Sequence, residues 1–190
     1  MGSQDPRMGE ISSDGLFQWN GRDWSPLAKS HREPTPWTLP LQQAAAAYLL
    51  LDTVQSLVTT ALFLNVASEE RVTRAQNPAI APDQLQAAAN LGVALGWGTV
   101  IVLAVIRLVL AAGSVRGWRW TFWAVLAWLA LGSVGVVTNL VALANPNAQT
   151  QPPAAIGVSL LFAVVALALL AWSIAAAVRY GPWAMRKPGP

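Results

Sequence analysis

Hydrophobic residues along the chain gather into four long stretches that are separated by shorter polar segments. Each stretch is longer than the roughly 20 mostly apolar residues that an α-helix needs to cross a hydrocarbon layer about 30 Å thick. The pattern therefore predicts an all-α fold, an integral membrane four-helix bundle with both termini on the same side. The predicted spans are about 41 to 64, 85 to 112, 120 to 144 and 154 to 178.

The segments outside these spans divide the chain into three parts. Residues 1 to 40 form a polar leader with five prolines and few aliphatic residues, which we expect to be mostly flexible. Residues 41 to 178 form the four-span membrane domain, and residues 179 to 190 form a basic tail.

The distribution of charge predicts the orientation in the membrane. Charged residues are only 11% of the 190, compared with about 25% in an ordinary soluble domain. The loops after the first and third spans carry only two basic residues, Arg71 and Arg74, offset by acidic ones. By the positive-inside rule, both termini are cytoplasmic in a bacterial inner membrane. The other basic residues suit lipid headgroups as partners, and their spread over three segments argues against nucleic acid. They include Arg7, Arg22, Lys29, Arg32, Arg116, Arg119, Arg179, Arg186 and Lys187.

An aromatic segment, FQWNGRDW at 17 to 24, interrupts the polar leader within a predicted β-hairpin at 16 to 26. Asn20-Gly21 is a favoured two-residue hairpin turn, which would pair Trp19 with Arg22 and Phe17 with Trp24. These four side chains would then share one face. An isolated hairpin is marginally stable in water, so we expect it to dock on the membrane interface, a partner, or the loop 114 to 119.

The run GLFQWNGRDWSP, at 15 to 26, carries a resemblance to a known class of segments. It resembles the short W-D-G-x-x-W segments at the cytoplasmic N-termini of many actinobacterial membrane proteins, often in a domain of unknown function. Asn20 stands where those segments usually have Asp. The resemblance covers about 12 residues and implies an actinobacterial source and a docking element. It implies no activity.

A polar stripe runs along the first span around Asp52, which lies close to the expected bilayer midplane. An ionisable group there costs on the order of 2.5 to 3.5 kcal/mol, so it should face protein or water. Two interpretations remain open: a cavity or ion path in which Asp52 binds a cation or proton, and, as we prefer, interhelical hydrogen bonds that fix packing. The stripe consists of Tyr48, Asp52, Gln55, Ser56 and Thr59.

Arg107, in the second span, is the natural counter-charge for Asp52. It lies about six residues inside the cytoplasmic end, which leaves an axial gap to Asp52 of about 9 Å at 1.5 Å per residue. An extended arginine could just close that gap. The alternative, which we favour, is that Arg107 snorkels to the headgroups.

Small residues and tryptophans predict the packing faces and the boundaries. Such small residues let helices approach closely, within the chain or in a homo-oligomer. They are Gly92, Gly96, Gly132 and Gly135, with Asn139 on the same face as the last two. Five tryptophans fall at the cytoplasmic boundary, where indoles anchor a bundle, whereas three deeper ones suit packing or lipid better than a pocket. The boundary set is Trp37, Trp118, Trp120, Trp123 and Trp183, and the deeper set is Trp97, Trp128 and Trp172.

The two halves of the membrane domain show a weak internal similarity. Asn77-Pro78 and Asn145-Pro146 lie in corresponding outward loops, and VRGWRW at 115 to 120 corresponds to VRYGPW at 178 to 183. A duplicated helical hairpin would explain both pairs. Common loop and interface chemistry explains them as well.

The chemistry available to the chain points away from catalysis. The sequence has no cysteine and one histidine, His31, and it shows no nucleophile elbow or phosphate loop, so we expect no cofactor, no metal site and no enzyme. We interpret Glu69 and Glu70 as residues of a solvated outward loop, and the alternative is a weak outward cation site. We predict a non-catalytic accessory subunit or oligomeric scaffold, with a homo-oligomer or another membrane protein as partner. The alternatives are a homo-oligomeric channel or ion-coupled transporter that uses Asp52, and a lipid-binding membrane protein.

Overall fold

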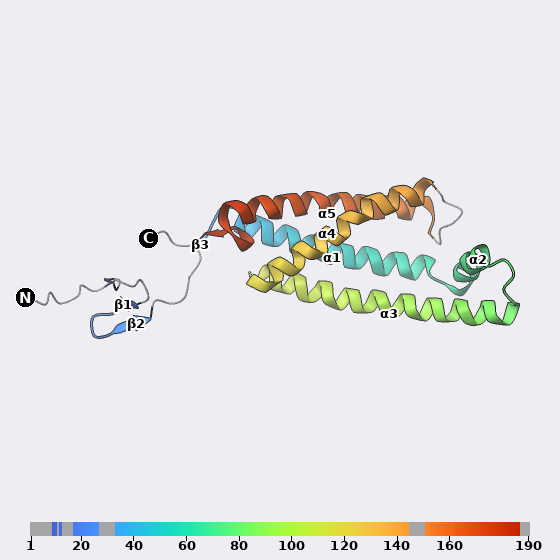
Figure 1. Ribbon diagram of the computed structural model, residues 1–190, viewed down its shortest axis with the longest axis horizontal. Helices are drawn as coiled ribbons and strands as arrows, with labels where there is room; N and C mark the ends of the chain where they lie inside the picture. Colours follow the sequence, from blue (N-terminus) through green and yellow to red (C-terminus); the bar gives the residue numbers. More distant parts are fainter. Residues whose placement is uncertain (1–8, 11, 13–16, 27–32, 145–150, 187–190) are drawn as a thin grey trace, which may run out of the picture.

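The computed structural model describes residues 9–10, 12, 17–26, 33–144 and 151–186. Within this part, four helices are long and apolar enough to cross a membrane, which confirms the predicted all-α four-helix bundle. They run along the long axis of the molecule (Figure 1). These helices are α1 (Thr38–Phe63), α3 (Pro82–Val115), α4 (Arg119–Ala144) and α5 (Pro153–Tyr180). The predicted Asn145-Pro146 turn and most of the leader, His31 included, lie outside the described residues.

The four spans form two antiparallel pairs (Figure 1). Helix α1 packs mainly against α3, and α4 packs mainly against α5. Between these pairs, α4 begins beside the end of α3 and crosses α1 toward α5 (Figure 1). The buried core lies toward the end of the bundle where α1 begins and α5 ends, with Leu41 and Leu49 of α1, Phe122 and Leu129 of α4 and Trp183 almost fully buried. Toward the opposite end, α3 and α4 diverge.

Small residues set the close approach of α4 to α5. A β-carbon added at Gly132 would lie 3.3 Å from Cβ of Ala166, and one added at Gly135 would lie 3.2 Å from Cβ of Ala163. Neither alanine can rotate its Cβ away. Gly132 and Gly135 therefore mark a packing face, as predicted, and this face joins two helices of the same chain.

The first outward connection contains a helix, α2 (Val66–Gln76), that the sequence analysis did not predict. Asn65 caps it: its side chain accepts from the Ser68 amide at 3.0 Å, and the Ser68 hydroxyl accepts from the Asn65 amide at 3.1 Å. The interpretation of Glu69 and Glu70 as loop residues is therefore wrong. Glu69 lies over Gly92 of α3, where an added β-carbon would come within 3.0 Å of its Oε2.

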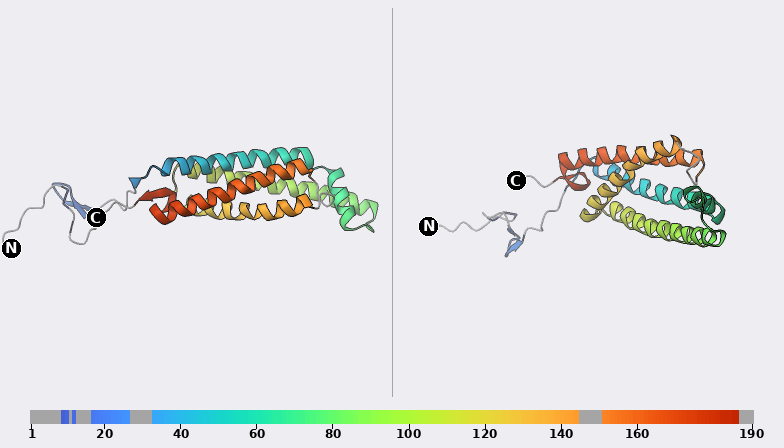
Figure 2. Two further views of the ribbon diagram at one scale, coloured as in Figure 1. Left: turned by 90° about the horizontal axis from the view of Figure 1, so that it is seen from above. Right: turned by 45° about the vertical axis from the view of Figure 1, so that its right-hand side comes forward.

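The segment that precedes α1 and the segment that follows α5 meet at the end of the bundle opposite α2. Strand β3 (Glu33–Pro34) pairs antiparallel with β4 (Met185–Arg186), which follows a 3₁₀ turn, η2 (Pro182–Ala184). The hydroxyls of Thr35 and Thr38 both donate to the carbonyl oxygen of Ala184, at 2.8 and 2.9 Å. The segment before α1 and the segment after α5 therefore lie side by side and are hydrogen-bonded to each other, as the turned view also shows (Figure 2).

Trp183 is buried at this end instead of anchoring the bundle among headgroups as predicted. Only 1% of it is exposed, its ring meets Phe122 edge to face, and its indole Nε1 donates to the carbonyl oxygen of Trp118 at 2.8 Å. It adopts φ 56°, a strained left-handed conformation that these contacts hold in place. Trp118, Trp120 and Trp123 are 40 to 55% exposed, and their role at the membrane boundary stays a prediction.

The aromatic hairpin forms, but in a different register from the one predicted. Strands β1 (Phe17–Trp19) and β2 (Trp24–Pro26) pair Trp19 with Trp24 and Phe17 with Pro26. The Asn20 side chain accepts from the amides of Arg22 and Asp23 at 2.9 and 2.8 Å, so the connection has four residues and Arg22 lies in it, off the strand face. In both views the hairpin lies apart from the bundle, away from the loop 114 to 119 (Figures 1 and 2).

Candidate functional site: a polar groove between the spans

Asp52 and Arg107 form an ion pair inside the bundle. Asp52 is the fifteenth of the 26 residues of α1 and so lies near the middle of its span. Its Oδ2 lies 2.9 Å from Nε of Arg107 on α3, and only 13% and 11% of the two side chains are exposed. Together they place a neutral unit at a depth where an isolated charge is costly.

Two further contacts keep the Arg107 guanidinium inside the bundle. Its Nη1 donates to Oγ of Ser56 at 3.0 Å, and its Cζ lies 5.1 Å from the centre of the Trp128 ring on α4, within cation–π range. Its Nε is buried without a well-aligned hydrogen bond, so the contact with Asp52 is chiefly electrostatic. The interpretation of Arg107 as a snorkelling residue is therefore wrong.

The remaining residues of the polar stripe also face into the bundle. Gln55 Nε2 donates to Oγ1 of Thr59 at 3.1 Å and to Oγ of Ser159 on α5 at 3.2 Å. Tyr48 is 6% exposed, and the centre of its ring lies 6.2 Å from that of Phe162. The stripe thus joins α1 to α3 through Ser56 and Asp52, and to α5 through Gln55.

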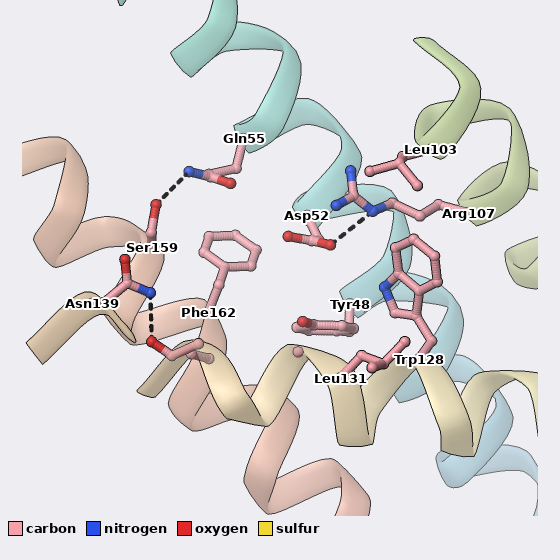
Figure 3. A pocket seen from close by; sticks show the side chains of 13 residues that line it. Tyr48, Asp52, Gln55, Leu103, Arg107, Trp128, Leu131, Asn139, Ser159 and Phe162 are labelled. Carbon is pink, nitrogen blue, oxygen red and sulfur yellow. Dashed lines mark hydrogen bonds and ion pairs between the residues drawn. The ribbon is translucent and has the colours of Figure 1, made fainter. Parts of the chain in front are cut away.

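A cavity of about 430 Å³ lies over the stripe, with lining residues from all four spans (Figure 3). We call it the α3–α4 groove, because Leu103 of α3 and Leu131 of α4 both line it and Leu131 is 72% exposed. The second oxygen of Asp52, Oδ1, points into it (Figure 3). The lining residues are Tyr48, Asp52, Gln55, Leu103, Arg107, Trp128, Leu131, Gly132, Gly135, Asn139, Ser159, Phe162 and Ala163.

The other predicted residues divide between the groove and distant positions. Gly132, Gly135 and Asn139 border the groove, although the Asn139 amide donates to its own helix, to the Gly135 carbonyl at 2.7 Å. Gly92 lies instead against Glu69 of α2, and a β-carbon at Gly96 would meet the side chain of Leu64, the residue that follows α1. The hairpin residues Phe17, Trp19, Arg22 and Trp24 do not line the groove.

Six residues that line the groove are not predicted from the sequence, and two of them, Trp128 and Ser159, have hydrogen-bonding side chains. The sequence pattern favours packing or lipid contact for Trp128 and indicates no role for Ser159. Trp128 stands one helical turn before Gly132 and Ser159 lies one turn before Ala163, so helical spacing from residues on the α4–α5 packing face would have pointed to both.

The groove offers binding chemistry without an obvious reactive group. Its carboxylate is paired with a guanidinium, and its other polar groups are an amide, hydroxyls and an indole. Within the described residues, no group of three histidine, aspartate or glutamate side chains lies where it could hold a metal ion. The arrangement is suited to packing helices together and to holding a small polar group.

The fold and the groove define the class of the protein: a four-span α-helical membrane protein with a neutral ion pair in its interior. Comparisons with family models, with curated proteins and with solved structures gave no match to this chain.

Proposed function

We propose that this protein is a non-catalytic accessory subunit or oligomeric scaffold of a bacterial inner membrane, with both termini in the cytoplasm. The observation that carries the proposal is the uneven burial of the spans. In the most apolar window of α3 and of α4, only 11% of the residues are buried, compared with 22% in α1 and 28% in α5. The helices α3 and α4 thus offer the broadest faces for contacts with other membrane helices.

The polar residues within the membrane support the same proposal. Asp52 is neutralised by Arg107, and Gln55 is hydrogen-bonded to Ser159. Each interaction joins two different spans, as expected for polar residues whose role is to fix helix packing. A rigid scaffold needs such links and needs no reactive group.

An exposed aromatic and basic surface lies at the end of the bundle where α1 begins and α5 ends, and it also supports the proposal. Trp118, Trp120 and Trp123 are exposed there beside Arg119, and the Arg116 guanidinium lies over the Trp118 ring at 5.4 Å. This combination suits the cytoplasmic headgroup region or a partner at that depth.

Cysteine cross-linking in native membranes tests the scaffold proposal, because the chain has no cysteine of its own. Val105→Cys on α3 and Val137→Cys on α4 replace side chains that are 56% and 64% exposed, and Leu161→Cys on α5 replaces one that is 61% exposed. We expect discrete cross-linked species, with a second copy or with one partner, at positions 105 and 137. Leu161→Cys, the matched control, should remain monomeric. Equal cross-linking at all three positions, or none, would contradict the proposal.

One observation favours a second candidate function, ion-coupled transport. Asp52 Oδ1 points into the groove, where it could accept a cation or a proton (Figure 3). Against this candidate, Arg107 already compensates the charge at 2.9 Å, and four spans seldom enclose a pathway without forming an oligomer. Ion flux measurements in proteoliposomes separate the two functions.

A further inference from the structure

Leu131, which lines the α3–α4 groove at the middle of α4, is 72% exposed, so the groove has a mouth at Leu131 that faces the surroundings of the bundle, where lipid lies. Leu103 lines the groove from α3, and α3 and α4 diverge from their connecting turn. Its floor lies near the middle of α1, at Asp52. A molecule dissolved in the bilayer could therefore reach the polar floor without passing through water.

The charges at the floor restrict what can bind there. The Asp52–Arg107 pair is already neutral, so a charged ligand would add an uncompensated charge at the depth where charges are most costly. Phospholipid headgroups also lie about 15 Å away, at half the thickness of the hydrocarbon layer. The ligand that fits this floor is therefore uncharged.

The hydrogen-bonding chemistry restricts the ligand further. An ionised carboxylate only accepts hydrogen bonds, so a ligand that bonds to Asp52 Oδ1 must bring a donor. An uncharged lipid supplies one as a free hydroxyl. The apolar side chains of Leu103, Leu131 and Phe162 then suit its hydrocarbon part (Figure 3).

The size of the groove excludes a whole transmembrane helix as its occupant. One helical turn, 5.4 Å long and 10 to 12 Å wide with side chains, fills about 420 to 610 Å³, and a spanning helix has more than five such turns. The groove has about 430 Å³, which lies within the range of small-molecule sites.

We propose that the α3–α4 groove binds an uncharged, hydroxyl-bearing lipid of the diacylglycerol or long-chain alcohol type, whose hydroxyl donates a hydrogen bond to Asp52. The hydrocarbon part leaves the groove between Leu103 and Leu131 and continues into the bilayer. This site goes beyond the scaffold function and does not depend on it.

Native mass spectrometry of the protein released from phosphatidylcholine nanodiscs tests this site. The probe is dioleoylglycerol, and the matched control ligand is the same lipid with its hydroxyl acetylated. We expect one dioleoylglycerol per chain, bound about three- to thirtyfold more tightly than the acetylated form, which is the effect of one hydrogen bond in a membrane. Equal retention of both lipids would show only annular lipid and overturn the proposal.

Two substitutions on α4 locate the site without touching the ion pair. Leu131→Trp fills the mouth of the groove, whereas Leu140→Trp adds the same ring at a position that is 53% exposed and does not line the groove. Dioleoylglycerol should be lost from the Leu131 variant and retained by the Leu140 variant. If both variants retain it, the site is elsewhere. If Leu131→Trp instead breaks an oligomer that retains no lipid, a second chain occupies the groove; either result overturns the proposal.

Discussion

At the scale of single residues, the Asp52–Arg107 pair determines the character of the membrane interior. Burying two charges is expensive, and the cost is offset only when they compensate each other and find further partners. Arg107 does both, through Asp52 at 2.9 Å, Ser56 at 3.0 Å and the face of Trp128. The pair acts as a link between α1 and α3 as long as both members are present.

The first prediction concerns removal of one member of this pair. Asp52→Asn or Arg107→Gln alone should lower the unfolding free energy in detergent by about 3 to 5 kcal/mol, because the remaining charge is left buried and uncompensated. The double variant should recover most of that loss. Reversible unfolding of all four proteins measures the coupling. Additive losses would show that the two residues do not act as a pair.

The residues of this pair could be named from the sequence, but their contact could not. Spacing along α1 gave the stripe, and the axial gap of about 9 Å left both pairing and snorkelling open. What decides between them is Trp128, whose ring covers the guanidinium from α4. No local pattern relates Trp128 to Arg107, since the contact depends on how α4 crosses the bundle.

At the scale of secondary structure elements, glycine determines how closely α4 approaches α5. Gly135 lies against Ala163, whereas Gly98 of α3 has nothing within 4 Å of an added β-carbon. A larger side chain at Gly135 changes both helix packing and helix propensity, whereas one at Gly98 changes helix propensity alone.

The second prediction uses that contrast. Gly135→Leu should destabilise the bundle by about 1 to 3 kcal/mol, the usual cost of overpacking, because it forces α4 away from α5. Gly98→Leu should be neutral or stabilising, since leucine favours the helix and has open space. Thermal melting in detergent compares them. Equal melting temperatures would mean that α4 and α5 are not packed through Gly135.

The elements also show which sequence signals are sufficient. The four spans were predicted to within a few residues, because length and hydropathy alone decide whether a helix crosses a bilayer. Helix α2 was missed because it is too polar for that signal, and its capping pair, Asn65 and Ser68, departs from the usual Ser/Thr with Glu/Gln pattern. The hairpin register was missed because the Asn20 side chain caps two amides and lengthens the turn.

At the scale of the whole molecule, the chain segments before α1 and after α5 are joined at one end. Thr35 and Thr38 bond to Ala184, and β3 pairs with β4, while α2 lies at the opposite end (Figure 1). The orientation across the membrane follows from the distribution of basic residues alone.

The third prediction tests this orientation with single cysteines in the cysteine-free chain. Ala75→Cys on α2 should react with a membrane-impermeant maleimide on intact spheroplasts, because the positive-inside rule places α2 outside. Gln18→Cys on β1 should react only after the membrane is opened. The reverse pattern would place both termini outside and remove the cytoplasmic aromatic and basic surface from the proposed function.

We interpret Asp52 as a structural member of a neutral pair and not as the centre of an ion path. The direct measurement is proton, sodium and potassium flux in proteoliposomes that contain the natural protein or the Asp52→Asn/Arg107→Gln variant, with an ionophore added at the end to verify each gradient. Both proteins are first matched for oligomeric state and melting. We predict flux no greater than that of empty liposomes in either preparation. Flux in the natural protein that is lost only in the variant would contradict it and establish transport through Asp52.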